Sequence, residues 1–484
     1  DLAMFSGCTN LNSITCLATN ISATSCTENW VDGVAASGTF IKADSMTSWT
    51  TGGSGIPTGW VTQGYSASKY LTFEAIESGT FAFTNDVSYS VDNGSTWVSL
   101  AANTSTPTVS AGNKIMFKAT LTPASSSGIG TFSSTGRFNA IGNPMSLLYG
   151  DNFVGQTSLS GKDYAFYMLF YNCTNLVNAE NLSLPATTLA NYCYYYMFYG
   201  CTSLTTAPTL PATTLTGGCY GSMFRGCTSL TTAPTLPATT LAYSCYQEMF
   251  ASCSGLTTAP STLPATTLAY SCYHSMFQGC TSLTTAPSTL PATTLANSCY
   301  QNMFYGCTSL TTAPDLSATT LAERCYASMF YDCSALTTAP SLPATTLAND
   351  CYYSMFNGCT SLTTAPSLPV TTLANYCYYS MFLGCVSLTT APSLPATTLV
   401  KSCYQYMFYN CSSLNSITCL ATNISATNCT TNWVNGVAAT GTFTKHPYMT
   451  SWTRGNYGIP HGWTVKDKQV PYDEQYLTFE AIRS

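Results

Sequence analysis

The 484-residue chain carries few charges, because Asp, Glu, Lys and Arg make up only 7% of its residues, against about 25% in a typical soluble domain. Its formal net charge at pH 7 is −6 and its 14 Lys and Arg residues form no cluster, which excludes the basic footprint of a nucleic-acid-binding protein and a polybasic membrane patch. Since no apolar run approaches the roughly 20 residues that cross a bilayer, we expect no membrane insertion.

Residues 1–66 recur near the other end of the chain. The strings TCLATNIS, NWV, GVAA and MTSW appear in both places in one constant register, which matches Trp30 to Trp433 and Trp60 to Trp463. YLTFEAI follows each copy, starting at Tyr70 and at Tyr476. The last coil of a solenoid needs a cap, because it would otherwise expose its apolar face. We therefore predict that residues 1–66 cap a preceding repeat array and that residues 415–475 cap the array of this chain.

Residues 70–147 contain short runs of β-forming residues. Val87, Tyr89 and Val91 alternate with serines, as expected for a strand with one buried face. The string DNG at 92–94 is a strong signal for a tight turn. We predict an Ig-like β-sandwich of about 80 residues.

Residues 148–414 consist of near copies of one unit, written CYYSMFNGCTSLTTAPSLPVTTLANY at 351–376. A fixed period of this length is typical of a solenoid, and we expect about ten stacked repeats of about 26 residues each. The period is slightly longer in two copies. It is marked by the first cysteines of the units, which are Cys193, Cys219, Cys245, Cys272, Cys299, Cys325, Cys351, Cys377 and Cys403.

Each unit divides into two halves with different periods. Leu189, Cys193, Met197 and Cys201 are spaced by four, which predicts a short helix with one apolar face. The run TSLTTA predicts a short strand, which the following proline ends because it has no amide to donate. One strand and one helix per unit is the layout of a leucine-rich repeat. The predicted structural core comprises Cys193, Met197 and Cys201 in one copy and Cys351, Met355 and Cys359 in another.

The predicted fold is therefore an α+β repeat fold, a leucine-rich-repeat-type solenoid preceded by a small Ig-like β-sandwich. Residues 476–484 match the segment at Tyr70, and we expect them to begin a next sandwich module. The chain would then be an interior piece of a longer protein built from tandem modules of about 400 residues.

The pattern MF.GCTSLTTAP.LPATTLA..CY resembles leucine-rich repeats of the BspA-like type, in which AF.GC.SL..I.IP recurs. The resemblance covers residues 164–414, with Met in place of the family's Ala and a second Cys in each unit. With YLTFEAI ahead of it, the pattern also resembles proteins of gut Bacteroidales and their phages. The resemblance implies adhesion or surface display, outside the cell, on the cell surface or on a phage tail. It carries over no catalytic residue.

The 24 cysteines have three possible roles. On a helix, the Cα atoms of Cys193 and Cys201 would lie about 12 Å apart, beyond the roughly 7 Å within which a disulfide forms. We therefore favour buried free thiols that form ladders along the stack. Disulfides between neighbouring coils are an alternative. Metal binding is a weaker one, because C-x7-C lacks the close cysteine pairs of a zinc site, and we expect no metal and no cofactor.

No catalytic set emerges from the sequence. The histidines His274, His446 and His461 are scattered, and the carboxylates of the array occupy positions that are neutral in sister repeats. A glycosidase would need two carboxylates at a defined separation in one cleft. We therefore expect that the chain is not an enzyme.

The positions that vary between repeats form the candidate ligand-binding face. On the predicted helices these side chains point away from the core, and they are rich in the residue types of adaptable binding surfaces. Packing of tyrosines between neighbouring coils or chains is a second explanation, and free drift of exposed positions is a third. The candidate outer face comprises Tyr195, Tyr196, Tyr199, Arg225, Gln247, His274, Gln301, Tyr305, Tyr331, Tyr353, Tyr379 and Tyr409.

The repeat array, the lack of a catalytic set and the sparse charge favour an extracellular adhesion or display protein. Its partner would be a glycan or a protein on a cell surface. One alternative is a structural fibre or surface-layer protein that self-associates through tandem modules. Another is the accessory region of a polysaccharide-degrading enzyme.

Overall fold

The computed structural model describes residues 3–16, 18, 21–22, 25–42, 46, 49–64, 69–125 and 127–469. It forms two compact units, Asp1–Ala238 and Thr239–Ser484. Residues 476–484, which we predict to begin a next sandwich module, lie outside the described residues.

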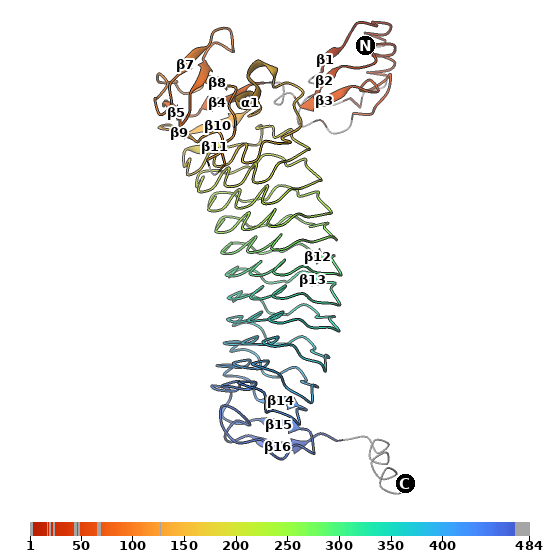
Figure 1. Cartoon of the computed structure of the whole chain (residues 1–484), viewed down its shortest axis with the longest axis vertical. Helices are drawn as coiled ribbons and strands as arrows, with labels where there is room; N and C mark the ends of the chain where they lie inside the picture. The colour runs from red at the N-terminus through yellow and green to blue at the C-terminus, as the bar shows by residue number, and fades with distance from the viewer. Residues whose placement is uncertain are drawn as a thin grey trace. The chain divides into compact units, whose positions relative to one another are not determined.

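The first unit begins with a small parallel sheet, called here the N-terminal module (Figure 1). Its strands pair in the order β1 (Ser13–Cys16), β2 (Thr39–Lys42) and β3 (Val61–Gly64). The indole N–H of Trp30 donates to the Gly55 carbonyl at 2.9 Å. That of Trp60 donates to the Ala35 carbonyl at 2.7 Å. The two indoles belong to one buried cluster with Phe40, so a few aromatic side chains fix the loops between the strands.

An antiparallel β domain follows. Its strands are β4 (Leu71–Ala75), β5 (Phe81–Phe83), β6 (Val87–Ser90), β7 (Val98–Leu100), β8 (Lys114–Lys118), β9 (Phe132–Ser134) and β10 (Phe138–Ile141). The main sheet contains the order β10-β4-β8-β6-β7, and β5 pairs with β9 in a second sheet. The predicted tight turn lies between β6 and β7, where Asn93 and Gly94 have φ of 59° and 86°. The Ig-like assignment of residues 70–147 stays a prediction.

The core of this domain is a group of phenylalanines centred on Phe73. The Phe73 ring centroid lies 4.7 to 5.8 Å from those of Phe81, Phe117, Phe132, Phe138 and Phe170. Phe170 belongs to the repeat array, so the β domain and the first coils share one core. The main sheet of the β domain also extends into the repeat array, because β11 (Leu176–Asn178) of the array pairs parallel with β10.

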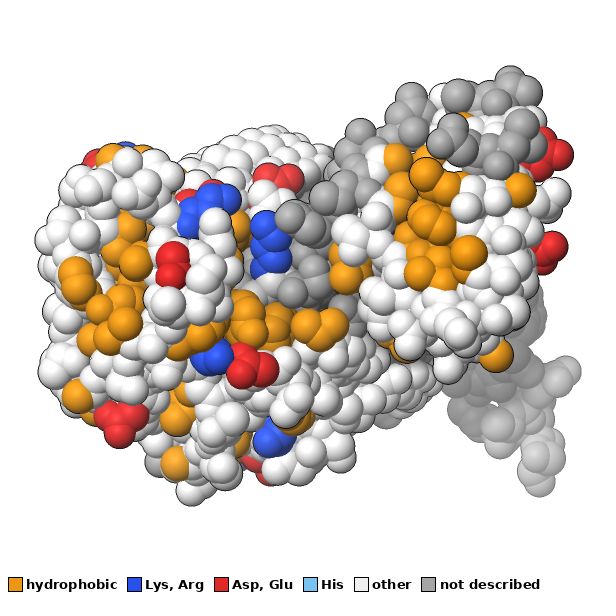
Figure 2. All heavy atoms as spheres, turned by 90° about the horizontal axis from the view of Figure 1, so that it is seen from above, with side chains coloured by type: hydrophobic (Ala, Val, Ile, Leu, Met, Phe, Trp, Pro, Cys, Tyr) orange, Lys and Arg blue, Asp and Glu red, His pale blue; other side chains and the backbone are white. Residues whose placement is uncertain are grey.

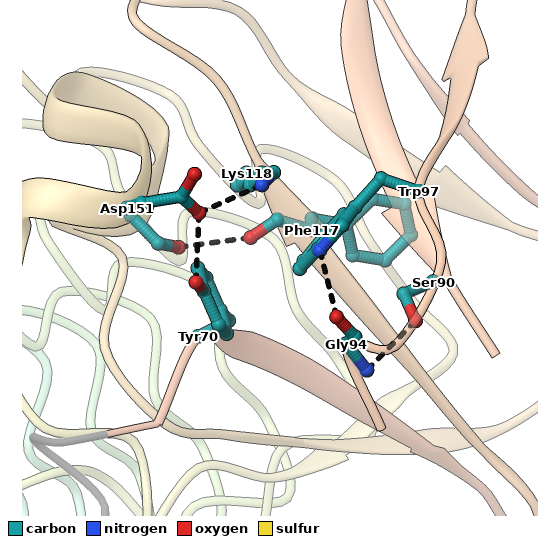
Figure 3. A network of polar contacts seen from close by, with 8 residues as sticks. Tyr70, Ser90, Gly94, Trp97, Phe117, Lys118 and Asp151 are labelled. Carbon is teal, nitrogen blue, oxygen red and sulfur yellow. Dashed lines mark hydrogen bonds and ion pairs between the residues drawn. The ribbon is translucent and has the colours of Figure 1, made fainter. Parts of the chain in front are cut away.

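A polar network also joins the β domain to the first coil (Figure 3). This coil carries α1 (Ser146–Tyr149) and η2 (Gly150–Asn152). The Asp151 carboxylate accepts hydrogen bonds from the Tyr70 hydroxyl and from Lys118 Nζ, each at 2.7 Å. Lys118 Nζ lies 4.3 Å from the ring centroid of Trp97. These contacts fix the end of the β domain against the start of the array.

The helix predicted in each repeat is wrong. Residues 190–201, called here the turn segment, are a series of turns in which Tyr192, Tyr196 and Gly200 have φ of 55°, 58° and 69°. The Tyr195 N–H bonds locally to the Tyr192 carbonyl at 3.2 Å, whereas the Tyr194 N–H donates to Cys219 of the next coil at 2.9 Å. Local and inter-coil bonds alternate along the segment in this way, so every second amide links two coils.

A spacing of four residues fits both structures, and this explains the error. Residues i and i+4 share one face of a helix, and they also share one face of a turn segment whose left-handed positions recur every four residues. These positions recur in the later copies of the repeat: Gly218, Ser222 and Gly226; Ser271, Ser275 and Gly279; Asp350, Ser354 and Gly358; Tyr376, Ser380 and Gly384.

The strand predicted in each repeat is reduced to single bridges over most of the array. One parallel ladder in the second unit connects Thr258, Thr285, Thr312, Thr338 and Thr364. A longer pairing joins β12 (Thr289–Leu290) to β13 (Asp315–Leu316). The prolines of the repeat shorten the strands because they cannot donate to a ladder.

The second unit ends in a copy of the first sheet, called here the C-terminal module. Its strands are β14 (Ser416–Cys419), β15 (Thr442–Lys445) and β16 (Thr464–Asp467), paired parallel in that order. Each strand begins and ends at the residues that match the bounds of its counterpart in the N-terminal module, as Ser416 matches Ser13. Among the described residues, no helix is long and apolar enough to cross a membrane.

Candidate functional site

The interior of the array is built from rows of identical side chains, one from each coil. Neighbouring tyrosine rings stack at 5.6 to 5.9 Å along Tyr273, Tyr300, Tyr326, Tyr352 and Tyr378. Neighbouring phenylalanine rings stack at 5.5 to 5.7 Å along Phe277, Phe304, Phe330, Phe356 and Phe382. The residues assigned to the core also lie inside, each with no exposed surface: Cys193, Met197, Cys201, Cys351, Met355 and Cys359.

All 24 cysteines are free thiols in the structure, although the helix on which we based their separation is not present. The Cys359 thiol donates to the Phe330 carbonyl of the preceding coil at 3.1 Å, and the Cys385 thiol repeats this bond to Phe356. Burial raises the pKa of the Cys351 thiol to about 12, which suppresses the nucleophilic thiolate. The buried thiols therefore act as packing groups and as weak donors between coils.

The turn segment divides its side chains into inward and outward pairs. Cys193-Tyr194 and Met197-Phe198 are buried, while Tyr195-Tyr196 and Tyr199-Gly200 are half-buried. All twelve residues of the candidate outer face are half-buried. The candidate face is therefore partly covered by its own neighbours.

The densest group on this face is the N-terminal tyrosine cluster, which belongs to the first unit. It consists of Tyr164, Tyr167, Tyr171, Tyr192, Tyr195, Tyr196 and Tyr199. Rings of successive coils stack: Tyr164 on Tyr192 at 5.1 Å, Tyr167 on Tyr195 at 6.1 Å and Tyr171 on Tyr199 at 4.9 Å. Tyr196 meets four of the other rings edge-on at 4.3 to 6.2 Å.

Two glycines of the next coil make room for this cluster. A Cβ at Gly218 would lie 2.5 Å from the Tyr192 ring, and one at Gly221 would collide with the Tyr195 ring. The Arg225 guanidinium lies 5.8 Å from the ring centroid of Tyr199, within cation–π range. One side of the cluster thus packs against the backbone of Gly218 and Gly221, and the Arg225 side chain lies at its edge.

A second group, the C-terminal tyrosine cluster, belongs to the second unit and contains Tyr353, Tyr376, Tyr379, Tyr406 and Tyr409. Tyr353 and Tyr379 stack at 4.6 Å, and Tyr406 connects Tyr379 to Tyr409 through edge contacts at 5.7 and 5.8 Å. Burial, with the neighbouring tyrosines, raises the pKa of Tyr379 to about 12. Lys401 Nζ lies 5.3 Å from the Tyr376 ring centroid.

The remaining candidates do not join these clusters. Tyr305 and Tyr331 form a separate stacked pair at 4.6 Å. Gln247, His274 and Gln301 are half-buried in other coils. Burial lowers the pKa of His274, which favours its neutral form.

The candidate outer face derived from the sequence omitted Tyr164, Tyr167, Tyr171 and Tyr192. The signal was present, because the string DYAFYMLFYNC at 163–173 is followed in the next unit by its near copy NYCYYYMFYGC at 191–201. Side chains one coil apart lie side by side in a solenoid. Aligning the first, irregular coil with the second would have paired the tyrosines.

The described residues contain no group of three or more His, Cys, Asp or Glu side chains that could hold a metal ion. Charged side chains are few and scattered on the face seen in Figure 2. A hollow of about 770 Å³ lies on the β domain, lined by Tyr89, Val98, Lys114 and Met116 among others. We therefore take the two tyrosine clusters as the candidate binding site on the turn segments.

The comparisons with known proteins agree with this repeat architecture. A model of the BspA type leucine rich repeat region matches residues 163–284, 262–381 and 328–431. No curated protein matches the sequence. The matched family is a repeat family rather than an enzyme family, and its repeats are typical of surface or protein-binding proteins. Because the matched ranges together cover more than half of the chain, the protein belongs to the family of BspA-type leucine-rich repeat proteins.

Proposed function

We propose that the chain is a non-enzymatic, extracellular adhesion protein that binds a glycan or a protein on a cell surface through its tyrosine clusters. The observation that carries this proposal is the N-terminal tyrosine cluster, in which seven neighbouring rings form one aromatic surface. Membership of the BspA-type family supports a surface-exposed repeat protein with a binding role.

The cluster has the properties of a preorganised binding surface. Tyrosine supplies a large, rigid contact area at a low cost in side-chain entropy. The rings of Tyr171 and Tyr199 are already stacked at 4.9 Å, so a ligand would order few additional side chains. The ring surfaces that stacking leaves uncovered can pack against the C–H faces of sugars or against apolar side chains, and tyrosine hydroxyls donate and accept hydrogen bonds. With few charges nearby, we expect binding that depends little on salt.

The test compares tyrosines that contact a neighbouring ring with an exposed tyrosine elsewhere. The Tyr196→Ser and Tyr199→Ser variants should lose binding to glycan arrays and to cells. Tyr270→Ser is the matched control, because Tyr270 is 61% exposed and belongs to neither cluster. Binding that is unchanged in both cluster variants would contradict the proposal.

Packing between coils is the competing explanation of the same rings, and stability separates the two. If the tyrosines serve only as packing groups, Tyr199→Ser lowers the melting temperature, and the unmodified chain binds none of the glycans or cells. If they serve binding, affinity falls at temperatures where the variant is fully folded. Circular dichroism melts of each variant, recorded beside the binding assays, give this comparison.

A structural fibre built from tandem modules is the second candidate, because the two modules have the same fold at both ends of the described chain. It places the tyrosines in lateral contacts between chains. Light scattering and electron micrographs that show only dispersed monomers at high concentration would count against it.

A further inference from the structure

The N-terminal and C-terminal modules are one structure in two different environments. Their strand boundaries coincide when the two copies of the sequence are aligned. Their tryptophan hydrogen bonds coincide as well: Trp30 to Gly55 and Trp433 to Gly458 are both 2.9 Å, and Trp60 to Ala35 and Trp463 to Ala438 are both 2.7 Å. Any difference in exposure between matched residues therefore reports what covers each module.

In the C-terminal module, the face that carries β14 is covered by the preceding repeat. The Phe382 N–H donates to the Met407 carbonyl at 2.9 Å, and the Gly384 N–H donates to the Tyr409 carbonyl at 2.8 Å. The Phe382 ring stacks on Phe408 at 5.8 Å. The Phe382 carbonyl accepts the Cys411 thiol at 2.9 Å.

The same repeat also extends the sheet of the C-terminal module. Thr390 bridges Ser416 in parallel register, and Leu394 bridges Cys419. β14 therefore has a pairing partner on both sides. Met407 and Cys411 are completely buried as a result.

In the N-terminal module the matching face is open. Met4, the counterpart of Met407, is 55% exposed, and Cys8, the counterpart of Cys411, is exposed. Phe5 and Leu11 are half-buried, whereas Phe408 and Leu414 are fully buried. Figure 2 shows hydrophobic side chains gathered on the end of the module that carries β1.

The backbone of this face is open as well. The carbonyls of Met4 and Ser6, counterparts of those that accept from Phe382 and Gly384, receive no backbone hydrogen bond within the described part of the chain. β1 pairs with β2 on one side and is the edge strand of its sheet on the other. An apolar face beside an open strand edge is the usual template for adding another strand.

We propose that this face, defined by Met4, Phe5, Cys8, Leu11 and the free edge of β1, is a docking surface for one BspA-type repeat that is joined to the chain ahead of Ala3. The occupant is specified by the C-terminal module: it presents a phenylalanine ring to Phe5, donates two alternate amides to Met4 and Ser6, and pairs a short strand with β1. A repeat fits because its counterpart already fills the matching face of the C-terminal module.

A second copy of this chain is a poorer occupant. The repeat at residues 377–402 already uses its amides and its strand to bind the C-terminal module, through Phe382, Gly384 and Thr390. A second copy would have to release these bonds before it could offer the same groups. The inference is independent of the proposed adhesion function.

The experiment adds a repeat in front of the N-terminal module and measures whether it covers this face. Residues 351–405 are fused directly to Ala3, so that Gln405 precedes Ala3 as it precedes Tyr406 in the chain. Alkylation of each thiol in the native protein is then followed by peptide mass spectrometry. The control fusion carries Phe382→Ser and Leu388→Asp in the added segment only, which removes the apolar contact and keeps the length.

We expect Cys8 to be alkylated rapidly in the unmodified chain and at least about tenfold more slowly in the fusion, because a covered thiol reacts only after local opening. The control fusion should return Cys8 to its original rate. Equal reactivity of Cys8 in the chain and in the fusion, with the thiols of the added segment protected, would overturn the proposal. Protection of Cys8 in the unmodified chain that rises with concentration, together with a dimer in sedimentation, would assign the face to a second copy instead.

Discussion

Single residues decide where the outer face can hold a tyrosine ring. Tyr195 lies over Gly221 of the next coil, where a Cβ would collide with it. The corresponding position in the following repeat is Gln247, and its coil partner is His274. Rings at equivalent positions of other coils stack instead, as Tyr353 does on Tyr379, so the orientation of the Tyr195 ring over Gly221 is specific to this pair of coils.

This pairing predicts the effect of a larger residue at Gly221. Gly221→Val should destabilise the protein by about 1 to 3 kcal/mol, the usual cost of overpacking. The double variant Tyr195→Ser, Gly221→Val should recover most of the loss, because the clash no longer exists. Urea unfolding midpoints of the two variants measure both effects, and additive losses would contradict the assigned contact.

The free thiols give a second prediction at this scale. Burial raises the pKa of Cys351, Cys377 and their neighbours in the row, so these thiols should resist iodoacetamide in the native protein. After denaturation without a reducing agent, all 24 cysteines should titrate. If fewer than about half of the thiols titrate, disulfides between coils would explain the result better than free thiols.

At the scale of elements, the turn segment shows what a sequence pattern can and cannot specify. The regular recurrence of the first cysteine predicted the stack, and the constant register between the two terminal copies predicted two equivalent modules. The spacing of Cys193, Met197 and Cys201 could not separate a helix from a turn segment, because both bury the same residues. The missed signal was the position before the second cysteine of each unit. It is a glycine with positive φ in six copies: Gly200, Gly226, Gly279, Gly306, Gly358 and Gly384.

The site was harder to predict than the fold. Sequence variation located the outward positions, among them Tyr195, Tyr196 and Tyr199. Which tyrosines would meet depended on the register between coils. The contacts among these tyrosines also depended on Gly218 and Gly221, whose lack of a side chain leaves room for the rings. Stacking distances cannot be read from one coil alone.

The junction between the β domain and the first coil yields a pH prediction. Hydrogen bonds from Lys118 and Tyr70 lower the pKa of Asp151, so the ionised carboxylate is favoured in the folded state. Its contribution to stability is present above the ordinary aspartate pKa and is lost as the pH falls through the lowered value. Asp151→Asn should therefore reduce the melting temperature slightly at pH 7.

The difference between the two proteins should shrink below about pH 4, where the carboxylate of the unfolded chain is already protonated. Because Asp151 is largely exposed, the effect at pH 7 should be small. Thermal melts of both proteins at pH 7, 5 and 3 measure it. A difference that grows on acidification would contradict the assigned network.

At the scale of the whole molecule, the array should behave as a stack of interchangeable units. Deleting residues 325–350 joins Arg324 to Cys351 and preserves the sequence of inward pairs. Because each repeat contacts only its neighbours, the shortened chain should fold and melt cooperatively. Deleting residues 325–337 removes half a unit and is the control.

Cutting half a unit should leave buried side chains facing the wrong neighbours, and we expect a loss of protease resistance. Limited proteolysis of the two deletion variants compares them directly. Equal resistance of both would show that register between coils matters less than the repeated hydrogen bonds indicate.

The alternating amides of the turn segment also give the array a direction. Within the first unit the Tyr194 N–H donates to Cys219, and within the second unit the Tyr352 N–H donates to Cys377, each from a coil to the one that follows. One end of such a stack therefore presents carbonyl oxygens and the other presents N–H groups. Two identical ends cannot satisfy one another across a twofold axis. Any assembly through these faces would consequently be head-to-tail, and such contacts extend into open filaments unless their rotation closes a ring.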